Sequence, residues 1–211
     1  MKLTPTSYAL LGLLAVDDWT TYELAQQTKR SLRFFFPRAE RQLYAEAKRL
    51  TEAGLATTTI AYTGRRASTT YAITAEGRSE LAAWLGTEPA PPVLEAEVVL
   101  RAFFADHGRV DDLLAALAAA RDQAVDAQRE LATLAGVWLA GDAPFPDRMS
   151  QGAITMRFVA DFHELVERWA TWAASEVSSW DDAQGRGWAG ARATFAAIAE
   201  RVEVQPGSRP E

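Results

Sequence analysis

Hydrophobic and polar positions at the start of the chain recur with helical periodicity and predict two short helices. Residues 5–16 are apolar on almost every side, which predicts a largely buried helix opened by an N-cap at Thr4 and a proline in its first turn. A second helix is expected at 20–29, capped by Thr20 or Thr21.

The next segment, 36–53, predicts a third helix with two different sides. On a helical wheel, Ala47 and Leu50 fall within about 40° of Leu43 and predict the buried side. The opposite, more polar side collects Arg38, Arg41, Ala45, Lys48 and Glu52. Gly54 follows where the helix is expected to end. Taken alone, a basic outer side is typical of any soluble helix.

Two β-rich runs follow this helix, at 55–62 and 67–73, and predict a hairpin because Gly64 permits the turn between them. Arg65 and Arg66 stand at the tip of that hairpin. Two helices, a basic helix and a hairpin with an arginine tip occur here in that order within one small-domain length. This order predicts a winged helix-turn-helix, a device that reads DNA.

A linker then separates two parts of the chain. Thr74 caps a further predicted helix, and Pro89, Pro91 and Pro92 mark the boundary after it. Beyond the prolines we expect helices at 93–106, 110–140, 151–181 and 188–202. The predicted fold class is therefore mainly α with a small β-hairpin wing. Its parts are a winged helix-turn-helix domain at 1–87, a helical dimerisation domain at 93–202 and a loose tail at 203–211.

The long helical segments carry more apolar surface than one chain readily buries. In 110–140 the apolar positions step by three and four residues, which is typical of a coiled-coil seam. In 151–181 they form one broad stripe. We interpret this as homodimerisation through 93–202, which would also present two recognition helices to a palindromic operator. A self-contained monomeric helical bundle is the alternative.

Composition is that of a globular protein, with 211 residues, 48% of them hydrophobic and 24% charged. No apolar run reaches the roughly 18–20 residues that span a bilayer, and the first residues lack signal-peptide features, so we expect a cytoplasmic protein without a membrane partner. The net charge of −6 is unevenly spread, because residues 1–87 hold 11 Lys and Arg against 8 Asp and Glu. Local charge governs phosphate binding, so the overall acidity does not exclude DNA.

The sequence gives little indication of catalysis or of metal binding. There is no cysteine, and the two histidines, His107 and His163, are far apart. A metal site beside His163 would need a second imidazole or a thiol. Motifs of the common hydrolases and nucleotide-binding proteins are absent. We expect neither an enzyme nor a cofactor.

Tryptophan is concentrated in the helical half, where five of the seven residues lie: Trp138, Trp169, Trp172, Trp180 and Trp188. Large flat side chains around a helical cavity suit a hydrophobic effector site. A place in the core or the dimer seam is the more common role of such a stripe. Trp138, Trp169 and Trp172 are the candidate effector-binding residues.

The first half of the chain resembles the PadR family of transcriptional regulators. The resemblance is carried by Leu-Leu-Gly-Leu-Leu-Ala (10–15), Thr-Tyr-Glu-Leu-Ala (21–25), Phe-Pro-Arg-Ala-Glu-Arg-Gln-Leu-Tyr (36–44), Lys-Arg-Leu (48–50), Gly-Leu (54–55), Gly-Arg-Arg (64–66) and Tyr-Ala-Ile-Thr-Ala-Glu-Gly-Arg (71–78). The chain departs from the family's pattern at Thr21, where glycine is usual, and at Ala47, where leucine is usual. Both positions are expected to affect how the helices pack and not the contacts with DNA.

The resemblance implies a homodimer that binds double-stranded DNA and responds to a small molecule, such as a planar aromatic compound. The residues implied at the DNA are Arg38, Arg41, Gln42, Tyr44, Lys48, Arg65 and Arg66. Repression is the expected outcome, with activation left open. The alternative from another functional class is a winged-helix adaptor that binds a protein and no specific DNA sequence.

Overall fold

The computed structural model describes residues 2–36, 40–63, 66–185 and 188–203. For residues 40, 41, 63, 66 and 201–203 it describes only the backbone. The predicted tail from residue 204 on lies outside the described residues. The chain divides into two compact units, Met1–Pro92 and Val93–Glu211. We call the first the winged unit and the second the helical unit.

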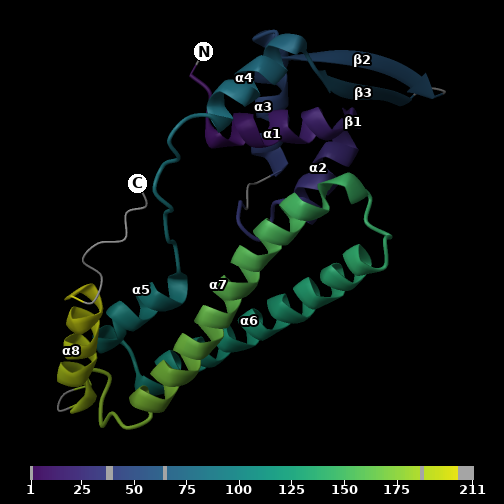
Figure 1. The fold of residues 1–211 in the computed structure, drawn as a ribbon. Coiled ribbons are helices and arrows are strands. Elements are labelled where there is room, and N and C mark those ends of the chain that lie inside the picture. Colours follow the sequence, from purple (N-terminus) through teal and green to yellow (C-terminus); the bar gives the residue numbers. More distant parts are fainter. Residues whose placement is uncertain (1, 37–39, 64–65, 186–187, 204–211) are drawn as a thin grey trace. The chain divides into compact units, whose positions relative to one another are not determined.

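The winged unit contains the predicted helices and hairpin (Figure 1). Its elements are α1 (Pro5–Val16), β1 (Trp19–Thr20), α2 (Thr21–Ser31), α3 (Glu40–Glu52), β2 (Ala56–Thr63), β3 (Arg66–Ile73) and α4 (Ala75–Leu85). The sheet is antiparallel with the order β1-β3-β2. The short strand β1 was not predicted; it adds a third strand because Trp19 pairs with Tyr71 and Thr20 with Thr70.

Local capping explains where these helices begin and end. Thr4 and Thr20 each form a capping box, with Ser7 and Glu23 respectively. Hydrogen bonds from the Thr20 hydroxyl and backbone lower the pKa of the Glu23 carboxyl. After α3, Gly54 adopts a φ of 72°, as expected of a glycine that ends a helix.

The core of the winged unit is built around α1, and this position explains the apolar composition of that helix. Leu10 and Leu11 are fully buried, and Leu50 of α3 is buried against the same cluster. Helix α4 is attached to α1 through Tyr8, whose ring stacks on Trp84 with centroids 4.5 Å apart. Burial, together with the hydrogen bond to Glu80, raises the pKa of Tyr8.

The helical unit contains three α-helices of 14 residues or more among its described residues. Its elements are α5 (Glu97–Phe103), η1 (Ala105–His107), α6 (Val110–Leu139), η2 (Pro146–Arg148), α7 (Met149–Val177) and α8 (Gly190–Glu203). The prediction of a helix over 93–106 was wrong in extent. Val93 and Leu94 precede the helix, and α5 ends at Phe103, after which a 3₁₀ turn leads to Gly108.

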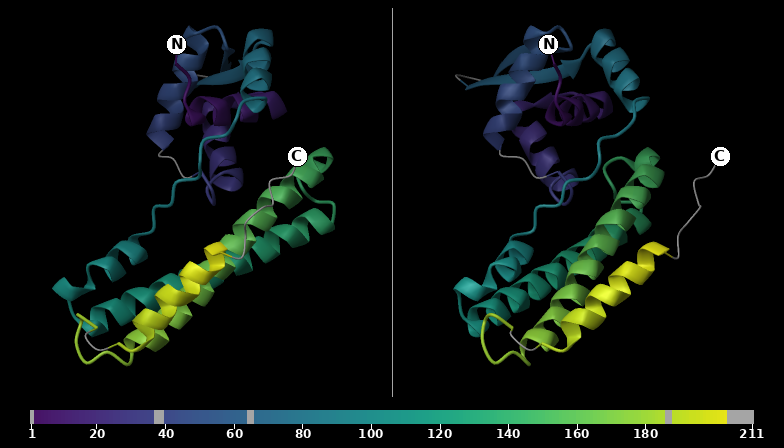
Figure 2. Two further views of the ribbon diagram at one scale, coloured as in Figure 1. Left: turned by 60° about the vertical axis from the view of Figure 1, so that its left-hand side comes forward. Right: turned by 90° about the vertical axis from the view of Figure 1, so that its left-hand side faces the viewer.

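Helices α6 and α7 form an antiparallel hairpin (Figures 1 and 2). Gly152 near the start of α7 lies against Trp138 near the end of α6, and Leu113 packs with Val177 at the other end. Between them the Gln128 side chain donates to Glu167 at 2.6 Å. The predicted seam of α6 is buried at Leu113, Leu117, Ala120, Ala124 and Leu131. This seam is therefore covered largely by the chain's own α7.

The predicted single stripe of α7 is divided between two sides of the helix. Val159, Ala170 and Val177 are buried, whereas Ile154, Phe158, Leu165 and Trp172 are exposed. These four exposed residues lie within about 40° of one another on the wheel and extend for about 27 Å along α7. We call them the outer stripe. No described helix is long and apolar enough to cross a membrane.

Candidate nucleic-acid interface and effector region

Helix α3 separates an anchoring side from an outer side, as its sequence predicts. Leu43, Ala47 and Leu50 are at most 3% exposed and face the core of the winged unit. Gln42 and Lys48 are exposed, and Tyr44 is half-buried between the two sides. The outer side of α3 is therefore the surface of this helix that another molecule can reach.

The predicted arginines fall partly outside the described residues. Arg38 and Arg65 lie outside them, and of Arg41 and Arg66 the structure describes only the backbone, in α3 and β3. The hairpin pairs from Ala56 opposite Ile73 out to Thr63 opposite Arg66. Its strands are thus eight residues each, long enough to carry the predicted arginine tip well beyond the short strand β1.

Two neighbouring cations on α3 have different surroundings. The Lys48 side chain is 77% exposed and approaches Glu52, which is 63% exposed, at 3.7 Å, a weak surface pair. Arg49 instead donates to Glu46 at 2.7 Å, and Glu46 is only 6% exposed. Lys48 is therefore the more available of the two for a phosphate, although the sequence gives both residues the same charge.

The three candidate effector residues do not converge on one place. Trp138 packs on Gly152, whereas Trp169 packs with Leu113 and Val177 at the far end of the hairpin. Gly152 and Trp172 are separated by roughly 30 Å of helix. Trp172 is 42% exposed, and its ring lies 6.4 Å from that of Trp188. A site within one subunit can therefore include only the Trp169–Trp172 end or the Trp138 end.

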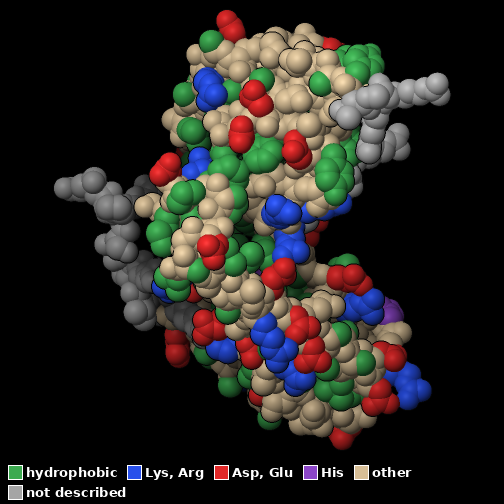
Figure 3. Space-filling model, turned by 90° about the vertical axis from the view of Figure 1, so that its right-hand side faces the viewer, with side chains coloured by type: hydrophobic (Ala, Val, Ile, Leu, Met, Phe, Trp, Pro, Cys, Tyr) green, Lys and Arg blue, Asp and Glu red, His purple; other side chains and the backbone are tan. Residues whose placement is uncertain are grey.

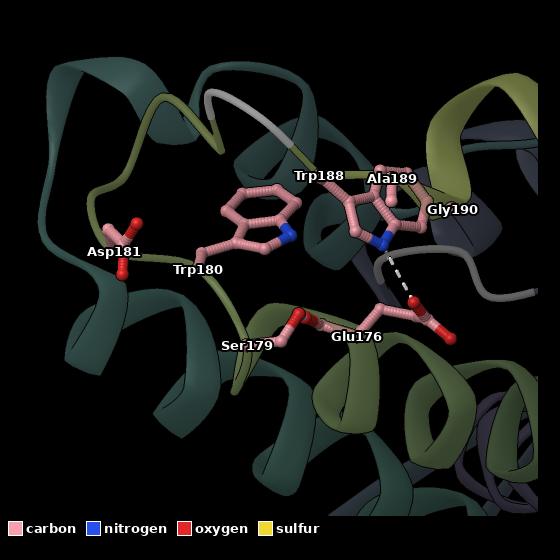
Figure 4. A pocket seen from close by; sticks show the side chains of 7 residues that line it. All are labelled: Glu176, Ser179, Trp180, Asp181, Trp188, Ala189 and Gly190. Atoms are coloured by element: carbon pink, nitrogen blue, oxygen red, sulfur yellow. Dashed lines mark hydrogen bonds between the residues drawn. The ribbon is translucent and has the colours of Figure 1, made fainter.

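A cavity of about 390 Å³ lies between the last turn of α7 and the start of α8, and Trp188, the ring neighbour of Trp172, is among its lining residues (Figure 4). The rings of Trp180 and Trp188 lie next to each other in its wall, tilted and with centroids 6.2 Å apart. The Trp188 indole donates to Glu176 at 2.7 Å. The sequence pattern did not single out Trp180 and Trp188 as effector residues, nor Glu176 beside them. Their proximity depends on the loop that turns back after α7, which helical periodicity does not reveal.

Elsewhere the helical unit presents mixed charge. Acidic and basic side chains are interspersed over the face seen in Figure 3, and many belong to local pairs such as Arg157 with Asp161 and Arg101 with Glu97. Burial lowers the pKa of His163. Within the described residues, no group of three or more His, Asp or Glu side chains is arranged to hold a metal ion.

Solved structures of other proteins share this architecture. No family model matches the chain. A segment of 100 residues is 35% identical to the negative transcriptional regulator PadR of Bacillus subtilis (strain 168), covering 46% of this chain and 54% of that protein. The chain also superposes on Bacillus subtilis PadR in complex with operator DNA, with a TM-score of 0.63 and 22% identity over 81% of this chain and 98% of the other.

The chain is thus similar to PadR in sequence over one segment and in fold over most of its length. The sequence match spans about half the length of that relative. A second structure, Bacillus subtilis PadR in complex with p-coumaric acid, superposes with a TM-score of 0.61 and 19% identity, over 84% of this chain and 99% of the other. The PadR-family fold, a winged unit followed by long helices, thus extends over most of the chain.

Proposed function

We propose that this chain is a DNA-binding transcriptional regulator of the PadR family, a repressor in the simplest case, rather than an enzyme. The observation that carries the proposal is α3, which buries Leu43, Ala47 and Leu50 and leaves Gln42 and Lys48 exposed beside a long two-stranded wing. Such an exposed helix is what a winged helix-turn-helix inserts into the major groove. The operator complex of Bacillus subtilis PadR supports this use of the fold.

Within this proposal, arginine and lysine contact phosphates and base edges. Gln42 is suited to read adenine, and an arginine at position 38 or 41 to read guanine. Tyr44 and Lys48 would donate to phosphates, whereas Arg65 and Arg66 at the wing tip would reach the neighbouring backbone or the minor groove.

The proposal includes a homodimer on a palindromic operator. The outer stripe of α7, together with exposed Phe103 of α5 and Phe195 of α8, leaves the helical unit with apolar surface that a second copy would cover. A two-fold dimer would present two α3 helices to successive turns of the same face of the duplex. This is the arrangement that a palindromic operator requires.

An effector would act by shifting the equilibrium between dimer arrangements that do and do not match the operator. The complex of Bacillus subtilis PadR with p-coumaric acid supports a planar aromatic ligand as the class to test. In this chain the Trp172 end of the hairpin, with its adjoining cavity, is the better candidate. Trp138 of the same subunit lies too far away to share that site.

DNA binding can be tested with duplex fragments from upstream of the protein's own gene. We expect an affinity that falls steeply with salt, with a log–log slope of about −5 if roughly six phosphates are contacted. Fluorescence anisotropy over a salt series measures it, with a scrambled duplex of equal length as the control. If no such fragment binds even at low salt, the adaptor alternative becomes the better explanation.

Effector binding can be tested by tryptophan fluorescence of the full chain. Planar aromatic compounds should quench the emission, and the Trp172→Phe variant should lose up to about tenfold in affinity because the phenyl ring offers a smaller aromatic face than the indole. Trp138→Phe is the matched control, since it alters the same residue type at the other end of the hairpin. Equal losses in both variants would argue against a site at Trp172.

A further inference from the structure

A charged side chain lies on the anchoring side of α3. Glu46 is only about 60° from Leu43 on the wheel, and it is 6% exposed within the winged unit. A carboxylate so withdrawn from water is costly unless it is paired and hydrogen-bonded. On the wheel Glu40 lies equally close to Leu43, so the sequence alone does not single out Glu46.

Both Glu46 oxygens have partners, and the partners come from two helices. The hydroxyl of Ser7 in α1 donates to Oε1, and Arg49 of α3 donates to Oε2 at 2.7 Å. Ser7 is fully buried, and its Oγ also accepts the Thr4 backbone N–H at 2.8 Å. The capping box of α1 is thus joined directly to the buried carboxylate. Its location at the N-terminal end of α1 is also favourable for a negative charge.

This link differs from the apolar contacts around it. Leu43, Ala47 and Leu50 attach α3 to the core, but apolar contacts tolerate small rolls and shifts of a helix. A hydrogen bond holds only within a few tenths of an ångström and over a limited range of angles. The Ser7–Glu46 bond therefore restricts both the roll of α3 and its position along its own axis. Those two variables determine where Gln42 and Lys48 point.

We propose that Glu46 is a positioning residue, which through Ser7 sets the orientation of α3 needed for operator selectivity. The inference rests on the proposed function, because it assigns a role to Glu46 in DNA reading. Glu46 itself faces the core and touches no DNA. Arg49, held by Glu46, supports the carboxylate and is the lesser of the two adjacent cations for phosphate contact.

A buried polar pair contributes little net stability compared with an apolar pair of similar volume. The double variant Ser7→Ala/Glu46→Leu should therefore unfold within a few degrees of the wild-type temperature. Its preference for the operator over a scrambled duplex should nevertheless fall by about tenfold, the size of one lost base contact. Removing the Glu46 charge raises affinity for both duplexes alike, so the ratio of the two affinities is the informative quantity.

Ser7→Ala alone changes no charge and serves as the second variant if the double variant does not fold. Thr28→Ala is the matched control, because Thr28 is also a buried hydroxyl of the winged unit, bonded to Leu24 within α2. It should keep the operator preference whatever its melting temperature. Folded Ser7 and Glu46 variants with wild-type preference, or an equal loss in Thr28→Ala, would overturn the inference alone. A wild-type protein without any operator preference would overturn the proposed function instead.

Discussion

Glutamates in place of Phe158 and Leu165 should leave the protein as a single 23.1 kDa subunit, whereas the wild type should sediment at twice that mass. Both side chains belong to the outer stripe and are more than half exposed, so the substitutions remove no contact from the core of their own chain. In the proposed dimer they would bury two unpaired carboxylates in each subunit. Such burial costs several kcal/mol and outweighs a typical apolar seam.

The control places the same two charges elsewhere on α7. Ala153 and Thr171 are exposed and lie about 115° away from the centre of the outer stripe. Ala153→Glu/Thr171→Glu should remain a dimer by sedimentation. Operator affinity should fall by about a hundredfold or more in the stripe variant only, because binding the second half-site would no longer be intramolecular. A stripe variant that stays dimeric would show that the subunits meet through another surface.

The ends of a helix could be predicted closely from the sequence where residues next to them in the chain determine them. The start of α1 follows from Thr4 and Pro5, and the end of α3 from Gly54, because capping is decided within a few residues. The extent of α6 likewise follows from its regular apolar spacing. By contrast, β1 has only two residues, and it forms because the chain returns 50 residues later with Tyr71 and Thr70. No local pattern contains that pairing.

The candidate sites could be predicted less well, because side-chain partners depend on packing between distant segments. A wheel of α7 identifies its apolar residues but not which of them α6 covers, so one broad stripe was predicted where Val177 is buried and Phe158 exposed. The tryptophans could be counted from the sequence, whereas the separation of Trp138 from Trp172 required the hairpin. Gln42 and Lys48 are exposed on α3 as expected. Their contact with DNA stays a prediction.

Alanine at Gly77 and alanine at Gly12 should change stability in opposite directions. A Cβ added to Gly77 in α4 would lie 2.1 Å from the Leu55 carbonyl oxygen, so backbone must move. We expect a loss of about 3 kcal/mol, since overpacking outweighs the gain in helix propensity. At Gly12, inside α1, an added Cβ meets nothing within 4 Å. That variant should gain about 0.5–1 kcal/mol, and urea unfolding of the full chain followed by circular dichroism measures both.

The Gly77 contact also bears on DNA binding. Leu55 connects α3 to β2, and Thr74 at the start of α4 holds the same junction by donating its hydroxyl to the Gly54 carbonyl at 2.8 Å. A displaced Leu55 carbonyl would therefore shift the wing relative to α3, and Gly77→Ala should lose operator affinity even where it remains folded. Gly12→Ala, on a helix without such a junction, should keep wild-type affinity. A Gly77→Ala protein with unchanged stability and affinity would mean that α4 can move away from Leu55 without disturbing the wing.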